Sequence, residues 1–97
     1  MKMRCFDENL IRIYMEETSV LEQGMRYMKH LNPSISDEVA KERAIVFAIE
    51  QCESIWMRYS TGYISNERLA FSVFLKDVSE KRYFYDDAMD AADQKDD

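Results

Sequence analysis

The fold of this chain is decided by residues 34–59, which read SISDEVAKERAIVFAIEQCESIWMRY. Ser34 or Ser36 is a suitable N-cap for a helix, and Asp37 and Glu38 lie where the positive end of the helix dipole favours negative charge. Apolar residues then recur at helical spacing for about four turns. These residues are Ile45, Ile49, Cys52, Trp56 and Tyr59, with Val46, Ala48 and Ile55 beside them. The pattern predicts the central core helix of an all-helical protein.

The preceding segment, residues 7–31, has the same periodicity. Its apolar positions include Leu10, Tyr14, Leu21, Met28 and Leu31. Asp7 can cap this helix at its start. Pro33 ends it, because proline has no amide hydrogen and disfavours a helical backbone at the residue before it. We therefore expect one helix over this segment.

The alternative is a break in that helix near Thr18. Ser19 followed by Glu22 has the spacing of a capping box, which marks the start of a new helix. Gly24 is also unfavourable in a helix interior. The sequence leaves both arrangements open, and we expect the single helix.

A third helix is expected after Gly62, which can supply a left-handed cap, with Ser65 or Asn66 at its start. Its apolar residues are too many for one helix face. They are Leu69, Phe71, Val73, Phe74, Leu75 and Val78. The helix is therefore either wrapped by its neighbours or partly exposed to a partner. We expect it to reach residues 83–85, Tyr-Phe-Tyr, where successive side chains lie about 100° apart and at least one ring stays accessible.

Length and composition predict one all-α domain, a small bundle of three to four helices. The chain has 97 residues, of which 46% are hydrophobic and 12% aromatic, so it contains enough apolar material for one core and too few residues for two. Two Gly and one Pro are too few for the many turns of a β-sandwich or barrel. We expect a helical domain over residues 1–85 and an acidic tail over residues 86–97.

Charge is concentrated in that tail. Residues 1–85 contain 12 Lys or Arg and 13 Asp or Glu, a net charge of −1, whereas residues 86–97 contain six Asp and one Lys, a net charge of −5. The N-terminal residues become acidic before any apolar signal region, and no apolar run approaches the length of a membrane span. Two distant cysteines fit neither a zinc site nor a disulfide framework. A cytoplasmic protein is expected.

No set of residues indicates a catalytic chemistry, so we expect a protein that is not an enzyme and needs no cofactor or metal. His30, the only histidine, lies at the expected end of a helix, where a cation is favoured. Cys52 lies on an apolar stripe, and Cys5 lies near the chain end. Glu50 and Glu53 suggest a di-metal bundle, but the Glu-x-x-His pairs which such a site needs are absent.

Direct binding to nucleic acid is disfavoured by the same charge count. The second and third helices resemble a helix-turn-helix, with basic residues at Arg68, Lys76, Lys81 and Arg82. Contacts to phosphate supply most nucleic-acid affinity, however, and this chain would bring an acidic tail to a polyanion. An acidic segment can instead occupy a basic groove on another protein that normally binds nucleic acid, and so exclude the nucleic acid.

A short segment resembles small helical immunity proteins of the colicin D type. The resemblance rests on the turn between two helices, Gly62-Tyr63-Ile64-Ser65, followed by Glu67 and Phe71. It covers about 20 of the 97 residues. Such proteins bind a toxin nuclease and mask its RNA-binding cleft. The resemblance implies a partner of that class, and the chain is similar in size and acidity to phage-encoded inhibitors of host nucleases.

The function expected from the sequence is that of a protein-binding inhibitor or modulator of a nucleic-acid-processing enzyme. The expected contact residues combine aromatic area with steering charge. They are Tyr63, Arg68, Tyr83, Phe84, Tyr85, Asp86, Asp87 and Asp90. The alternative is a helical adaptor that forms a homodimer through surplus apolar surface on the third helix, and a small DNA-binding regulator ranks below both.

Overall fold

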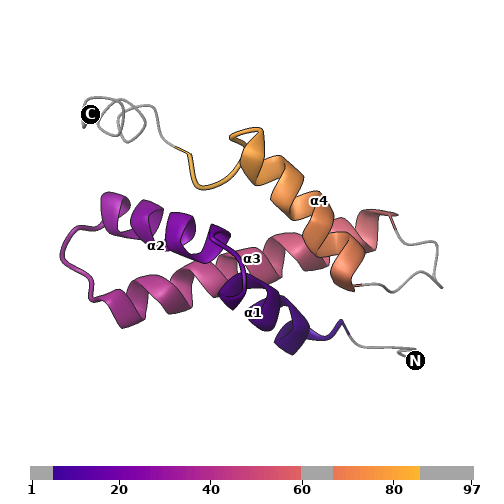
Figure 1. Cartoon of the computed structure of the whole chain (residues 1–97), viewed down its shortest axis with the longest axis horizontal. Coiled ribbons are helices and arrows are strands. Elements are labelled where there is room, and N and C mark those ends of the chain that lie inside the picture. The colour runs from indigo at the N-terminus through magenta and orange to yellow at the C-terminus, as the bar shows by residue number, and fades with distance from the viewer. Residues whose placement is uncertain (1–5, 60–66, 86–97) are drawn as a thin grey trace.

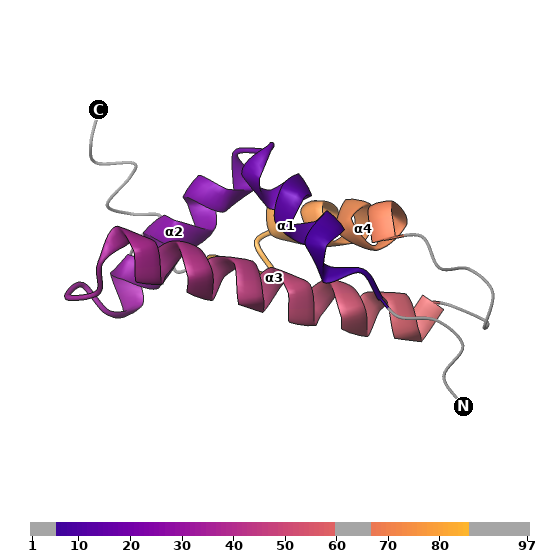
Figure 2. The ribbon, with the colours of Figure 1, turned by 90° about the horizontal axis from the view of Figure 1, so that it is seen from below.

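The structure is a computed structural model that describes residues 6–59 and 67–85. In these residues the chain forms four helices and no strand: α1 (Glu8–Glu16), α2 (Val20–Leu31), α3 (Asp37–Tyr59) and α4 (Glu67–Ser79). At 1.5 Å per residue α3 is about 34 Å long. The other three helices pack along one side of it (Figures 1 and 2). The expected all-α bundle is confirmed, and none of these helices is both long and apolar enough to cross a bilayer.

The expected single helix over residues 7–31 is wrong, because the chain breaks between α1 and α2. The hydroxyl of Thr18 donates to the carbonyl oxygens of Tyr14, at 3.0 Å, and Met15, at 3.4 Å. Ser19 makes no side-chain capping bond, so the break does not depend on the capping box that suggested it. The break turns α2 onto α3 while α1 packs against both α3 and α4 (Figure 1). A straight helix could not make both sets of contacts.

The helix starts follow the expected capping chemistry. A side-chain oxygen of Asp7 accepts a hydrogen bond from the amide of Asn9 at 3.0 Å, which caps α1. Ser36 accepts one from the amide of Val39 at 3.2 Å, which caps α3. At the other end of the connection, α2 stops at Leu31, before Pro33, as the sequence predicts. The expected caps at Gly62, Ser65 and Asn66 lie outside the described residues.

A buried carboxylate ties the starts of α1 and α4 together. Glu67 is only 7% exposed, and its Oε2 accepts a hydrogen bond from the backbone amide of Asp7 at 2.9 Å. This amide is one of the donors that a helix start leaves without an intrahelical partner. The contact spans 60 positions in the sequence, and nothing in the local pattern around Glu67 predicts it.

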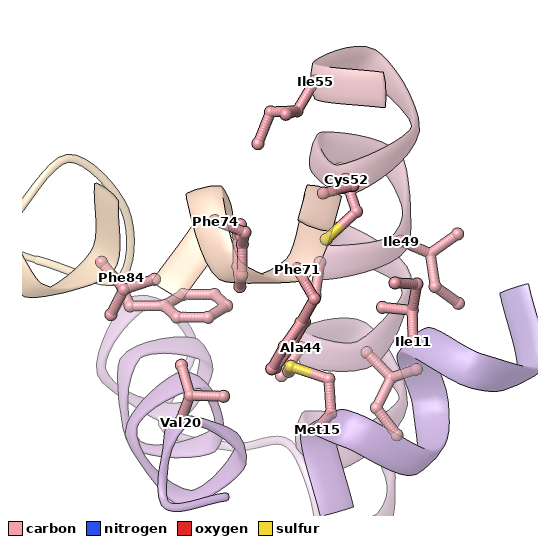
Figure 3. Close-up of a cluster of buried hydrophobic side chains, with 14 residues drawn as sticks. Ile11, Met15, Val20, Ala44, Ile49, Cys52, Ile55, Phe71, Phe74 and Phe84 are labelled. Carbon is pink, nitrogen blue, oxygen red and sulfur yellow. The ribbon is translucent and has the colours of Figure 1, made fainter. Parts of the chain in front are cut away.

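The core lies between α3 and the other helices (Figure 3). The residues buried on α3 are Ala40, Ala44, Ile45, Ala48, Ile49, Cys52 and Ile55. Val46, which the periodicity placed beside this stripe, is instead 41% exposed. On α4 the buried apolar residues are Ala70, Phe71, Phe74 and Val78. Leu69 remains 49% exposed, so most of the surplus apolar surface expected on this helix is covered within the chain.

Candidate partner-binding surface

The expected binding segment, residues 83–85, follows the C-terminus of α4, where two hydrogen bonds end the helix within one turn. The amide of Arg82 donates to the carbonyl of Asp77, and the amide of Lys81 donates to that of Val78, each at 2.9 Å. These two bonds form a Schellman motif, which requires a left-handed residue at its turn. Lys81 takes that position with a φ of 64°. The helix therefore stops before residues 83–85, and their expected helical arrangement is wrong.

Replacing Lys81 with glycine is expected to stabilise the protein by about 0.5–1 kcal/mol, because glycine adopts the left-handed backbone without strain. The gain is reduced by loss of the contact between Lys81 Nζ and the Tyr85 ring, whose centroid lies 4.9 Å away. The midpoint of urea unfolding measures the effect. Ser79→Gly, within the helix, is the control and should lower the midpoint. Equal losses in both variants would contradict the expectation.

Phe84 is part of the core and not of the surface. It is 2% exposed and takes a φ of 56°, in the left-handed region that a bulky residue rarely adopts. Its ring lies 6.0 Å from that of Tyr27 on α2, 5.2 Å from Phe47 on α3 and 6.0 Å from Phe74 on α4, between ring centroids. Phe84 thus fills the space at which three helices meet (Figure 3).

This position corrects the role expected for Phe84. A side chain that is already buried within the chain cannot insert into a partner, so the predicted contact through its ring fails for a physical reason. Tyr83 and Tyr85 on either side are half-buried. Tyr83 stacks on Phe74, with centroids 5.3 Å apart, and meets Phe47 edge-on at 5.5 Å. The aromatic area left to a partner comes from Tyr83 and Tyr85.

Gly24 provides the space that Phe84 occupies. A Cβ atom at this position would lie 2.9 Å from the Cβ of Ala44 and 3.0 Å from two atoms of the Phe84 ring. Both distances are shorter than ordinary carbon contacts. The sequence identified Gly24 only as a weak point in a helix, whereas the structure uses it for the close approach of α2 and α3.

The remaining expected contact residues do not join this cluster. Arg68 lies in the first turn of α4, with its guanidinium 5.3 Å from the centroid of the Tyr14 ring on α1. The rise of α4 places Arg68 about 16 Å from Ser79, the last residue of the helix, along the helix axis. Tyr63, Asp86, Asp87 and Asp90 lie outside the described residues. The structure therefore brings together Tyr83, Phe84 and Tyr85 and leaves Arg68 apart from them.

The next feature is the surroundings of the thiol, imidazole and carboxylate groups in the described residues. Burial raises the pKa of the Cys52 thiol to about 12, so it is protonated at neutral pH and is a poor nucleophile. His30 is exposed in the last turn of α2. Among residues 6–59 and 67–85, no three carboxylate, imidazole or thiol groups gather closely enough to hold a metal ion.

The main ion pair between helices is a surface contact. Both terminal nitrogens of Arg12 on α1 donate to Glu42 on α3, at 3.2 and 3.1 Å. These hydrogen bonds lower the pKa of Glu42 and raise that of Arg12. Lys29 on α2 forms a single ion pair with Asp37 at the start of α3. Exposed pairs of this kind contribute orientation more than stability.

Comparison of the chain with protein-family models, curated proteins and solved structures finds no match.

Proposed function

We propose that this chain is a non-enzymatic, cytoplasmic protein that binds a nucleic-acid-processing enzyme, such as a nuclease, and inhibits or modulates it by covering a basic surface. The observation that supports this most is the burial of Phe84, two residues before the acidic segment begins at Asp86. The segment that carries most of the net charge, −5 of −6, therefore follows a fixed point on the domain. In the sequence its six Asp follow directly after the half-buried rings of Tyr83 and Tyr85.

A fixed starting point matters because charge and contact area then act together. Six Asp in residues 86–97 attract a positively charged surface at long range and raise the association rate. Contact through the neighbouring aromatic area then slows dissociation. Arg82 does not oppose this attraction with an unpaired charge, since its Nε lies 3.3 Å from Glu80 and 3.7 Å from Asp77. A surface built to bind nucleic acid supplies the complementary positive charge.

The proposal predicts that neutralising the acidic segment slows binding. We expect a variant with all six Asp of residues 86–97 changed to Asn to associate with the captured nuclease about tenfold more slowly at low salt, and to lose most of the salt dependence. The intact chain is used as bait in an extract of its native host. Retained proteins are tested for hydrolysis of DNA and RNA, and association rates are then measured at several ionic strengths.

Two controls keep the result specific. A chain that ends at Tyr85 retains Phe84 and should unfold at nearly the same urea concentration as the full chain, so its loss of binding reports the missing charge. Saturating amounts of the intact chain should also reduce hydrolysis by the captured enzyme. Equal association rates for the intact and neutralised chains, or hydrolysis that saturation leaves unchanged, would contradict the proposal.

A further inference from the structure

Within residues 6–59 and 67–85, no helix covers the outer face of α3. Helices α1, α2 and α4 all lie on the opposite side (Figure 2). We define the outer face by six residues: Val39, Arg43, Val46, Glu50, Glu53 and Met57. Three of them are apolar and strongly exposed, with Val39 at 40%, Val46 at 41% and Met57 at 69%. An exposed apolar series on one helix is a candidate contact surface.

The spacing of the outer face is that of a coiled-coil seam. Successive members are separated by four, three, four, three and four positions, so the face repeats every seven residues. A repeat of this kind keeps one stripe of a helix in contact with a partner helix over several turns. The same spacing read from either end is identical, so in an antiparallel pair of copies the residues of one outer face lie opposite residues of the other outer face.

We propose that the outer face of α3 pairs with the outer face of a second copy of this chain, antiparallel, about a two-fold axis level with Ala48. Residues whose numbers are equally far from 48 then lie opposite each other. Val39 faces Met57 of the second copy, and Val46 faces its Glu50. Arg43 faces Glu53 of the second copy, and two-fold symmetry makes each contact twice.

Charge selects this arrangement over the alternatives. Arg43 forms no ion pair with the described residues of its own chain. In the antiparallel pair it lies opposite Glu53 and about 4.5 Å along the axis from Glu50, within reach of both carboxylates. A parallel pair would instead place Arg43 against Arg43 and each glutamate against its equivalent, which is unfavourable. At each end of the interface Val39 of one copy meets Met57 of the other, and these apolar contacts flank the ion pairs of Arg43.

The expected dimer is weak, because three apolar residues per copy give an interface at or below the size of standard stable complexes. We expect a dissociation constant on the order of tens to hundreds of micromolar. The inference does not depend on the proposed function, and the outer face does not include the residues assigned to partner binding. Arg43→Glu should therefore leave the capture of a nuclease unchanged.

Mixed cysteine variants test the geometry directly. In a Cys5→Ser background, chains with Val39→Cys are mixed with chains with Met57→Cys at several hundred micromolar and oxidised. The antiparallel pair brings positions 39 and 57 together, so most of the disulfide-linked product should contain one chain of each kind. Two copies of position 39 are about 27 Å apart in this pair, too far for a disulfide. Val39→Cys mixed with Leu69→Cys, an exposed position on α4, is the matched control.

A charge exchange tests the electrostatic part. Arg43→Glu is expected to raise the dissociation constant at least tenfold in sedimentation equilibrium, and Arg43→Glu with Glu53→Arg is expected to return it to within about threefold of the original. Arg43 is exposed and Glu53 is half-buried on α3, and neither is part of the core, so circular dichroism should show unchanged folding. The proposal would be overturned if the chain stays monomeric at millimolar concentration. It would also be overturned if the disulfides mainly link two chains that carry the same variant, or if the Leu69→Cys control cross-links equally well.

Discussion

Phe84→Ala is expected to lower the free energy of unfolding by about 3–5 kcal/mol, the usual cost of removing a buried phenylalanine ring. The ring is 2% exposed and touches aromatic residues of α2, α3 and α4, so its loss leaves a cavity at the point where these helices meet. The left-handed backbone at residue 84 is strained for phenylalanine and for alanine alike. In the original chain the burial of the ring offsets this strain, whereas in Phe84→Ala the strain remains without that compensation. Urea unfolding followed by circular dichroism measures the change.

The neighbouring tyrosine provides the control for Phe84. Tyr85→Ala removes a half-buried ring of similar size and should cost much less than Phe84→Ala. A chain that ends at Arg82 should be destabilised more than Phe84→Ala, because it lacks both the buried Phe84 ring and the Tyr83 ring that stacks on Phe74. If Phe84→Ala unfolds at the same urea concentration as the original chain, the ring is not part of the core and the exposed position expected from the sequence is restored.

Gly24→Ala is expected to lower the free energy of unfolding by about 1–3 kcal/mol, although alanine is the better helix former by about 1 kcal/mol. The added methyl group would lie 2.9 Å from the Cβ of Ala44 and 3.0 Å from the Phe84 ring. The Cβ of Ala44 is attached directly to the backbone of α3, so relief of the overlap requires the two helices to move apart. Thermal and urea unfolding both measure the loss.

A compensating change tests whether that overlap is the cause. Ala44→Gly by itself should be destabilising, because glycine is unfavourable within a helix. Combined with Gly24→Ala it removes one of the two short contacts, so the double variant should be more stable than the sum of the single effects predicts, by at least 0.5 kcal/mol as a rough threshold for coupled neighbours. A Gly24→Ala variant with a higher unfolding midpoint would show that α2 and α3 do not approach this closely.

Both changes also bear on the proposed binding role. Phe84 fixes the chain immediately before the acidic residues, and Gly24 provides the space in which the ring lies. A domain that loosens at this point presents the charges of residues 86–97 from a less defined position. We therefore expect the Phe84 and Gly24 variants to bind a partner less tightly in proportion to their loss of stability, whereas neutralising the tail changes binding without changing stability.

The sequence by itself determined the features that local chemistry controls. The periodicity of residues 34–59 predicted α3, Asp7 was correctly identified as a helix cap, and Pro33 correctly marked the end of α2. For α3 the sequence offered Ser34 or Ser36 as the cap, and the structure shows Ser36. Each of these depends on residues within about one helical turn, where hydrogen-bond geometry and side-chain spacing are set by neighbours in the chain. The distribution of charge between residues 1–85 and 86–97 is likewise a property of the sequence alone.

Only the tertiary structure decided what lies far apart in the chain. The chain breaks at Thr18 because α1 packs against both α3 and α4, whereas α2 packs mainly along α3. Phe84 was placed in the core by contacts with three helices, and Gly24 meets it across 60 positions of sequence. The outer face of α3 was identified by the absence of any described helix over it (Figure 2). Periodicity specifies which side chains share a face, but which face is covered depends on how separate helices pack, and a local pattern does not contain that information.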